Sequence, residues 1–173
     1  MLFFSSHTRR TLSPLTNNHR PPHTPHHPST PTTHRSEAGL TGIVYPNEYG
    51  GTRMEDQDAF HELILLDEMA RMGGGWVLGQ HGINSMALPP VLLAGSDAMK
   101  EKVARAVITG EKNICLAISE PGAGSDVANI QTAAVLSKDG SHYVVNGSKK
   151  WISGGAFGDF FTVRWYYHGR DRR

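Results

Sequence analysis

The spacing of apolar residues along this chain changes once, close to Asn113, and this change limits the folds that the chain can adopt. Before that point, as in Phe60–Ala70, large apolar residues recur three and four positions apart, which is typical of an amphipathic helix. After it, in Ile114–Ser119, every second residue is a large aliphatic one, which is typical of a strand. Helices followed by strands predict an α+β protein, with a helical subdomain first and an antiparallel β-subdomain after it.

Helix signals in the first half place three main helices. The pair Thr52 and Glu55 forms a capping-box pattern, in which each side chain bonds a free amide at the start of a helix. Pro89-Pro90 interrupts the pattern and begins a short helix that ends near Gly95, since proline is tolerated in a first turn. Ser96 is a suitable N-cap for the last helix. The expected main helices cover Arg53–Met72, Trp76–Leu88 and Asp97–Ile108.

Strand signals occupy the second half. After Ile114–Ser119, the stretch Ile130–Ser137 has a composition that favours a strand. Tyr143–Ser153 predicts a hairpin, because Asn146-Gly147 supplies the positive backbone dihedrals of a type I′ turn. The last predicted strand begins at Phe160 and runs to Val163.

The N-terminal segment differs in composition from the rest. Residues 1–36 contain four arginines and no Asp or Glu, and Arg20–Arg35 reads RPPHTPHHPSTPTTHR. Such a stretch has few apolar side chains to bury, so we predict that residues 1–39 are disordered. A mitochondrial transit peptide is the alternative, because the segment contains Arg and Ser and lacks acidic residues, although its prolines interrupt an amphipathic targeting helix. The compartment stays open, with mitochondrion and peroxisome as candidates.

Composition disfavours several classes of protein and site. A single cysteine, Cys115, excludes an internal disulfide, and no run of about 18 apolar residues is present to span a membrane. The net charge of +1 gives no electrostatic reason to expect nucleic acid as a partner. No metal site is expected, because nothing fixes the geometry of His23, His26 and His27. No carboxylate pair or nucleophile with its base is recognisable, so no residue is predicted to be catalytic.

A glycine-containing loop, Ser119–Asp126 (SEPGAGSD), follows the first predicted strand directly. Pro121-Gly122 favours a tight turn, Gly122 and Gly124 let backbone amides approach a ligand closely, and Ser125 adds a hydroxyl donor. The loop is therefore either a cradle for phosphate or pyrophosphate or a plain surface turn. It is neither a P-loop nor a dinucleotide GxGxxG motif, since Val127 stands where the last glycine is required.

Trp151-Ile152-Ser153 is the second candidate ligand-binding segment. On a strand, Trp151 and Ser153 would face the same side, about 6.5–7 Å apart. A flat heteroaromatic ring could then lie against Trp151 while Ser153 hydrogen-bonds to its edge. The alternative is a core tryptophan beside an ordinary serine at a strand end.

Taken in order, the two segments closely resemble the signatures of the acyl-CoA dehydrogenase family. The resemblance rests on Ile114–Ile130 and Tyr143–Gly155, extends to the helical half through the DEMAR run Asp67–Arg71, and covers residues 40–163. The family fold has an N-terminal helical domain, a middle β-domain and a C-terminal four-helix bundle. The resemblance implies that residues 40–110 belong to the helical domain, that 111–163 begin an incomplete antiparallel β-domain, and that 164–173 form a divergent tail.

The resemblance also implies an FAD site built from three short segments. These are the end of the first strand, which lies against the cofactor, the glycine loop, and the tryptophan segment beside the flavin ring. The implied cofactor-binding residues are Leu116, Ile118, Ser119, Gly124, Ser125, Trp151, Ile152 and Ser153. Ser125 is expected to contact the acyl-CoA substrate as well, and the Ser153 hydroxyl to lie near flavin N5.

The reaction implied by the resemblance is α,β-dehydrogenation of an acyl-CoA thioester. The hydride passes to flavin N5, and the electrons pass to an electron-transfer flavoprotein or a similar acceptor. Family members are homo-oligomers. The family's catalytic carboxylate lies in the C-terminal bundle, so we expect a truncated product that lacks the base. Two alternatives stay open: a non-catalytic product with at most weak flavin or CoA binding, and a fragment of a related acyl-CoA oxidase or flavin monooxygenase.

Overall fold

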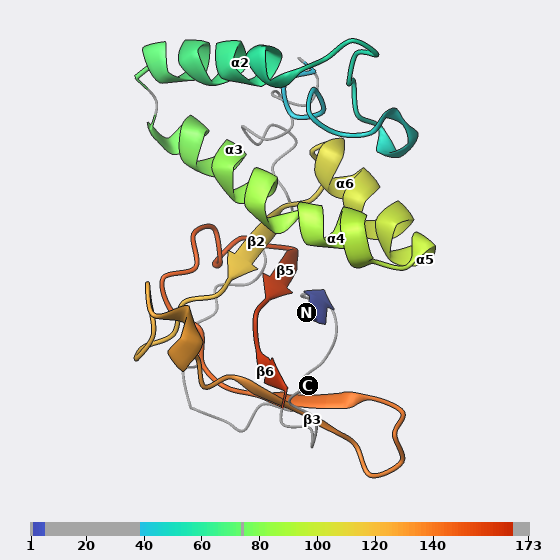
Figure 1. Ribbon diagram of the computed structural model, residues 1–173, viewed down its shortest axis with the longest axis vertical. Helices are drawn as coiled ribbons and strands as arrows, with labels where there is room; N and C mark the ends of the chain where they lie inside the picture. Colours follow the sequence, from blue (N-terminus) through green and yellow to red (C-terminus); the bar gives the residue numbers. More distant parts are fainter. Residues whose placement is uncertain (1, 6–38, 74, 168–173) are drawn as a thin grey trace.

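The molecule has a helical layer above two small β-sheets (Figure 1), which confirms the α+β fold class. The structure, a computed structural model, describes residues 2–5, 39–73 and 75–167. In chain order the elements are β1 (Leu2–Ser5), η1 (Asn47–Tyr49), α2 (Ala59–Arg71), α3 (Gly75–Ala87), α4 (Pro89–Ala94), α5 (Asp97–Met99), η2 (Lys100–Ala104), α6 (Arg105–Ile108), β2 (Ile114–Ala117), η3 (Val127–Asn129), β3 (Ala133–Leu136), β4 (Tyr143–Asn146), β5 (Phe160–Val163) and β6 (Tyr166–Tyr167).

The first long helix, α2, begins later than predicted. Its N-cap is Asp58, whose carboxylate accepts a hydrogen bond from the Phe60 amide at 3.0 Å, while the Asp58 amide donates to His61 Nδ1 at 3.2 Å. The predicted cap at Thr52 is wrong, because the Thr52 hydroxyl instead donates to the Gly39 carbonyl at 3.2 Å. Asp58 and His61 thus form the reciprocal cap that was expected further upstream.

The other helical predictions are confirmed with small shifts. The helix α4 starts on Pro89, with Pro90 also in its first turn, as expected for a residue without an amide proton. Ser96 caps the next helix, since its hydroxyl accepts a hydrogen bond from the Met99 amide at 3.3 Å. Residues 97–108 are helical throughout, although the middle element, η2, is wound as a π-helix.

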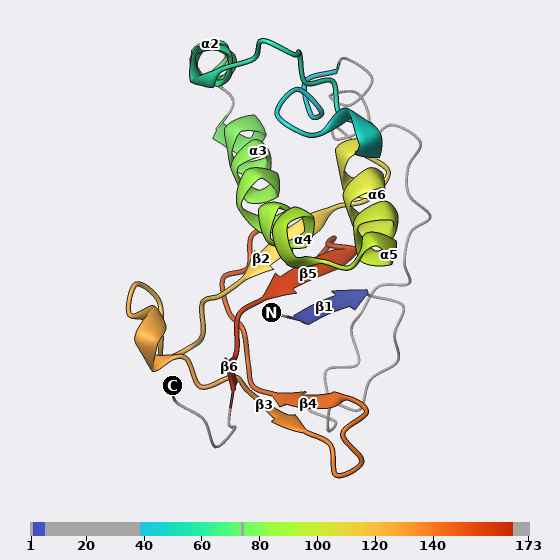
Figure 2. The same cartoon turned by 45° about the vertical axis from the view of Figure 1, so that its right-hand side comes forward.

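The upper sheet has the strand order β1-β5-β2 (Figure 2). The strand β1 corrects part of the prediction that residues 1–39 are disordered, because Leu2–Ser5 pair antiparallel with Phe160–Val163. Residues 6–38 lie outside the described residues. They include the histidine run and most of the segment on which the transit-peptide hypothesis rests. On its other side β5 runs parallel to β2, which corrects the purely antiparallel arrangement expected. The parallel pair arises because the connection from β2 to β5 passes through the lower sheet before it returns.

The lower sheet has the strand order β4-β3-β6, with β4 antiparallel and β6 parallel to β3. The hairpin predicted around Asn146-Gly147 is wrong, since residues 148–153 form no strand. The turn between β3 and β4 is made instead at Asp139-Gly140, where Gly140 has a φ of +71°. The Asp139 carboxylate stabilises this turn by accepting hydrogen bonds from Ser137 and Ser141.

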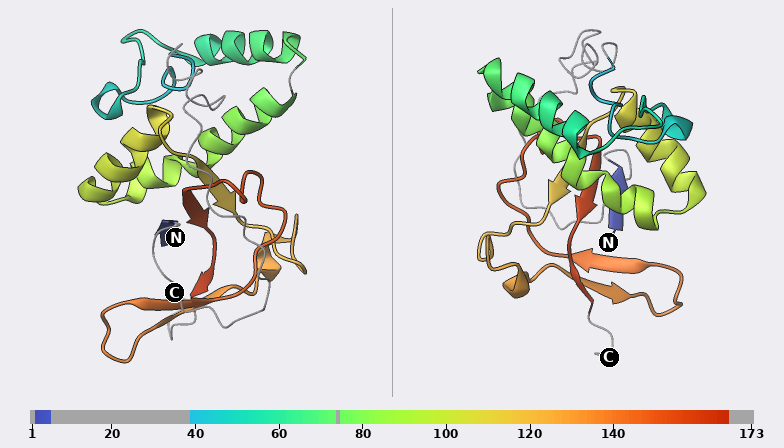
Figure 3. Two further views of the ribbon diagram at one scale, coloured as in Figure 1. Left: turned by 180° about the vertical axis from the view of Figure 1, so that it is seen from behind. Right: turned by 45° about the horizontal axis from the view of Figure 1, so that its top comes forward.

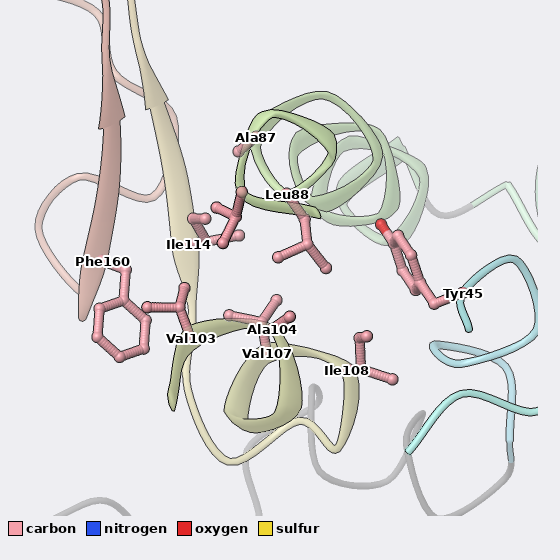
Figure 4. Close-up of a cluster of buried hydrophobic side chains, with 10 residues drawn as sticks. Tyr45, Ala87, Leu88, Val103, Ala104, Val107, Ile108, Ile114 and Phe160 are labelled. Carbon is pink, nitrogen blue, oxygen red and sulfur yellow. The ribbon is translucent and has the colours of Figure 1, made fainter. Parts of the chain in front are cut away.

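An apolar core lies between the helices and the upper sheet (Figure 4). Its buried members come from α3, α4, η2 and α6, from the junction of α3 and α4, from the starts of β2 and β5, and from the loop before η1: Tyr45, Ala87, Leu88, Val91, Val103, Ala104, Val107, Ile108, Ile114 and Phe160. The buried Thr162 hydroxyl also donates to the Ala87 carbonyl at 2.7 Å, which ties β5 to α3. The core therefore holds the start of β2 against the helices.

Two long loops join the sheets along one side of the molecule (Figure 3). Residues 118–132 lead from β2 to β3, and residues 147–159 lead from β4 back to β5. Each loop carries one of the two predicted ligand-binding segments. The fold thus brings segments that are far apart in the sequence to the same side.

Over residues 2–5, 39–73 and 75–167, no helix has both the length and the apolar character needed to cross a membrane. The same part of the chain contains no group of three or more His, Cys, Asp or Glu side chains arranged to hold a metal ion.

Candidate functional site

The strand β2 leads into the first candidate segment. Leu116 is half-buried and packs against the core, and Ile118 and Ser119, which follow the strand, are also half-buried. β2 lies at the edge of its sheet, with β5 on one side only. The strand is therefore anchored at its start and becomes accessible towards Ser119.

The glycine loop begins with the tight turn that the sequence predicts. Glu120 and Ala123 bond each other through their main-chain groups at 2.8 and 3.2 Å, with Pro121-Gly122 between them. Gly124 and Ser125 are exposed, and a Cβ added to Gly122 or Gly124 would meet no atom within 4 Å. Open space, and not backbone strain, distinguishes these two glycines, so their backbone is accessible to a ligand.

The tryptophan segment is a loop and not the predicted strand, so the strand spacing from which Trp151 and Ser153 were expected to share a side does not apply. Trp151 has a φ of +60°, in the left-handed region that side chains other than glycine rarely adopt. Its indole is 80% exposed, which also rules out a core tryptophan. Lys150 Nζ lies 4.6 Å from the ring centroid, within the range of a cation–π contact. Ile152 is half-buried and Ser153 is exposed.

Two hydrogen bonds hold the tryptophan segment against the end of β2. The Lys150 amide donates to the Ser119 carbonyl at 2.9 Å, and Lys149 Nζ donates to the Ile118 carbonyl at 2.8 Å. The two segments singled out from the sequence are therefore neighbours in space. This adjacency agrees with the expectation of one shared ligand site, while the roles of the individual residues stay predictions.

Sequence reasoning missed a buried ion pair at this junction. Lys149 Nζ lies 2.8 Å from Glu120 Oε1, and the Glu120 carboxylate also accepts the amides of Gln131 at 2.6 Å and Thr132 at 3.0 Å. Burial by itself would raise the pKa of the Glu120 carboxyl, but these hydrogen bonds lower it to about 2. The signal was available, since a glutamate and a lysine stand inside the two segments that were expected to meet.

An open hollow of about 500 Å³ lies beside the turn. Its lining comes from both loops and the end of β4: Glu120, Pro121, Gly122, Asn129, Gln131, Asn146, Gly147 and Ser148. It includes the turn at Pro121-Gly122 but none of Gly124, Ser125 or Trp151–Ser153. The predicted site residues thus do not line this hollow.

The rest of the second loop packs on the buried cysteine. Cys115 is buried, and Cβ atoms on Gly154 and Gly158 would lie 3.3 and 2.6 Å from its Sγ. Burial raises the pKa of the Cys115 thiol to about 11, with a further contribution from the charge of Asp159. Only glycine fits at position 158, so this close packing holds the loop against β2.

Comparison with known sequences gives the same family for both halves of the chain. The family model described as acyl-CoA dehydrogenase, N-terminal domain, matches residues 7–111, and that described as acyl-CoA dehydrogenase, middle domain, matches residues 115–173. Both matches extend beyond residues 40–163, on which the resemblance was based. A curated relative, acyl-CoA dehydrogenase apdG of Emericella nidulans, is 43% identical over 114 residues. That alignment covers 65% of this chain and 26% of the relative, so the chain spans about a quarter of the relative's length.

Two solved structures share the fold over most of the chain. The acyl-CoA dehydrogenase complexed with FAD from Bacillus anthracis has a TM-score of 0.69 at 35% identity, over 80% of this chain and 23% of the other. Butyryl-CoA dehydrogenase from Megasphaera elsdenii has a TM-score of 0.68 at 28% identity, over 76% of this chain and 34% of the other. The likeness in structure therefore reaches at least three quarters of the chain.

Proposed function

Because this chain belongs to the acyl-CoA dehydrogenase family, we propose that its two loops contribute to the FAD site of such an enzyme. The observation that carries the proposal is the hydrogen bond from the Lys150 amide to the Ser119 carbonyl, which sets the exposed Trp151 beside the glycine loop. A large aromatic side chain that is held in an unusual backbone conformation and left exposed is typical of a ligand-binding position.

The residues present suit a flavin nucleotide. Trp151 offers a flat apolar face to a planar ring, and the exposed Ser153 offers a hydroxyl to the edge of that ring. The open space at Gly124 allows a backbone amide to approach a phosphate group. When bound, FAD supplies a hydride acceptor to the reaction. The residues proposed to hold it are Leu116, Ile118, Ser119, Gly124, Ser125, Trp151, Ile152 and Ser153.

The proposed substrate is an acyl-CoA thioester, and the proposed reaction is its α,β-dehydrogenation. Ser125 is exposed next to the open backbone at Gly124, and it is proposed to bind the substrate as well as the cofactor. An electron-transfer flavoprotein or a similar carrier is the proposed acceptor, and a homo-oligomer is the proposed assembly. These assignments rest on membership of the family.

The buried carboxylate at this junction does not suit the role of the base in such a reaction. Both oxygens of Glu120 accept hydrogen bonds, and a carboxyl with a pKa of about 2 is a weak proton acceptor. Another group is therefore proposed to remove the α proton.

Titration of the purified chain with FAD tests the cofactor site. We expect the flavin fluorescence to be quenched on binding, and Trp151→Ala to weaken the affinity about tenfold, because one aromatic contact is lost. Gly124→Ala should weaken binding too, although its Cβ meets no protein atom. Phe157→Ala, which removes another exposed aromatic ring from the same loop, is the control and should leave the affinity unchanged.

Two results would contradict this proposal. One is a wild-type chain that binds no FAD at any concentration tested. The other is a Phe157→Ala variant that loses as much affinity as Trp151→Ala, which would show that the exposed aromatic rings act nonspecifically.

Because both oxygens of the Glu120 carboxylate accept hydrogen bonds within the fold, a second candidate is a non-catalytic flavin-binding product. The FAD-loaded chain is mixed with an acyl-CoA and an electron-accepting dye. Flavin binding without dye reduction supports this second candidate, whereas dye reduction supports a chain that carries its own base.

A further inference from the structure

We propose that Glu120 and Lys149 are positioning residues, which set the tryptophan segment against the end of β2 without contacting the ligand themselves. This inference rests on the proposed function, because it concerns the same flavin site. The two side chains form a buried pair, with exposed fractions of 5% for Glu120 and 13% for Lys149. Their burial distinguishes them from Gly124, Ser125 and Trp151, which are all exposed.

The Glu120 carboxylate gathers three parts of the chain. It belongs to the turn after β2, and it accepts hydrogen bonds from the amides of Gln131 and Thr132 at the end of the same loop, at 2.6 and 3.0 Å. The third partner is Lys149 Nζ, at 2.8 Å, from the second loop. A buried carboxylate is stable only when it is paired and hydrogen-bonded, so all three parts must stay together for the charge to stay buried.

The Lys149 ammonium completes the link to β2. Besides Glu120, it donates to the Ile118 carbonyl at 2.8 Å, just beyond the last residue of the strand. The next residue, Lys150, then donates its amide to the Ser119 carbonyl at 2.9 Å. Two successive residues of the second loop are thereby bonded to two successive carbonyls of the first.

This double attachment explains the conformation of Trp151. A left-handed φ at a residue other than glycine is unfavourable and persists only where its surroundings enforce it. Of the two residues before Trp151, Lys149 has its side chain largely buried, and Lys150 has its side chain over the indole ring. The ion pair therefore fixes the direction from which the indole meets a ligand.

Gly147 and Thr132 show that the approach of the two loops is close. A Cβ on Gly147 would lie 2.6 Å from the Thr132 Cα, so a larger residue has no room between them. Thr132 is the residue whose amide bonds Glu120 Oε1. The hydrogen bonds of the ion pair and this backbone contact act at the same junction.

The test compares Glu120→Gln, Lys149→Met and the double variant in the chain of 173 residues, with Lys138→Met as the control for loss of an exposed lysine. Amide hydrogen exchange at Lys150, measured without FAD, reports the attachment directly. FAD affinity and the residual flavin fluorescence at saturation report the position of the indole. Far-UV circular dichroism shows which variants are folded.

We expect each single variant to exchange the Lys150 amide at least tenfold faster and to bind FAD at least tenfold more weakly. Quenching of the bound flavin should also be incomplete at saturation. The double variant should regain stability, since no unpaired charge stays buried, but it should keep the incomplete quenching. Lys138→Met should match the wild type in all three measurements.

A purely structural role predicts a different result and would overturn the proposal. In that case affinity would fall only with the folded fraction, and quenching at saturation would equal that of the wild type. If Glu120→Gln does not fold, Lys149→Arg keeps the charge and changes its reach, and the same incomplete quenching is expected. A wild-type chain that does not bind FAD refutes the proposed function, whereas unchanged exchange at Lys150 in the variants refutes the positioning role.

Discussion

The helical layer and the two loops are held together by different forces. The helical layer buries apolar side chains such as Leu88, Val107 and Ile108 almost completely, in one core with the starts of β2 and β5. The loops keep Trp151 and Phe157 exposed, and they are joined instead by an ion pair and by main-chain hydrogen bonds. Apolar burial thus determines where the strands lie, while a few directional polar contacts determine how the candidate site is arranged on them.

The largest effect is expected in the apolar layer. Leu88→Ala should lower the free energy of unfolding by about 2–5 kcal/mol, because the fully buried side chain leaves a cavity. Leu93→Ala is the matched control, since Leu93 is 84% exposed, and its effect should stay within about 0.5 kcal/mol. Urea unfolding followed by circular dichroism measures both. Equal effects for the two leucines would show that apolar burial does not stabilise the helical layer in the way described.

A smaller loss of stability is expected where the two loops touch. Gly147→Ala should cost about 1–3 kcal/mol, because its Cβ would lie 2.6 Å from the Thr132 Cα and force the backbones apart. Gly122→Ala, whose Cβ meets no atom within 4 Å, should change stability by no more than about 0.5 kcal/mol. The same urea experiment applies, and a neutral Gly147→Ala would show that the loops do not pack as tightly as described.

The pH dependence of stability isolates the polar junction. The pKa of Glu120 is about 2 in the folded chain and 4.5 for the free side chain, so its contribution is complete above pH 4.5 and is lost as pH falls towards 2. We expect the wild type to lose about 1–2 kcal/mol more than Glu120→Gln over this range, with allowance for screening by solvent. Asp139 also has a pKa of about 2, so only the difference between the two proteins is informative. Parallel curves would contradict the assignment.

The smallest effect is expected at the indole itself. Trp151→Ala should change the free energy of unfolding by no more than about 0.5 kcal/mol, because the ring is mostly exposed and alanine meets the same left-handed backbone. Thermal unfolding without any ligand measures this. A large loss of stability would mean that Trp151 supports the fold, and the distinction between scaffold and site would no longer hold at this residue.

The elements that were predicted correctly are those with local signals. The helix that begins at Pro89, the Ser96 cap and the strand at Phe160–Val163 each depend on residues within a few positions. The helix α2 was placed correctly, but its start was not, because Asp58 and His61 make a cap from side chains outside the usual capping-box pattern.

The errors concern choices between distant partners. Asp139-Gly140 and Asn146-Gly147 are both good hairpin turns, and nothing local decides which one the chain uses. In the fold, Lys149 of the segment 148–153 is bonded to the first loop, and Asp139-Gly140 makes the turn. For the candidate site, the sequence predicted that the two segments would meet, and it placed Glu120 and Lys149 inside them, but no local pattern indicates that these two residues pair.

Because two glycines of the second loop pack on Cys115, the reactivity of this cysteine reports the motion of that loop. With a pKa of about 11, the thiol is almost entirely protonated at neutral pH. A reagent cannot reach the sulfur while residues 154–158 pack on it. Any modification of this sulfur must therefore wait for the second loop to detach from β2. The rate at which a thiol reagent modifies the chain's only cysteine therefore measures how often residues 154–158 detach from β2.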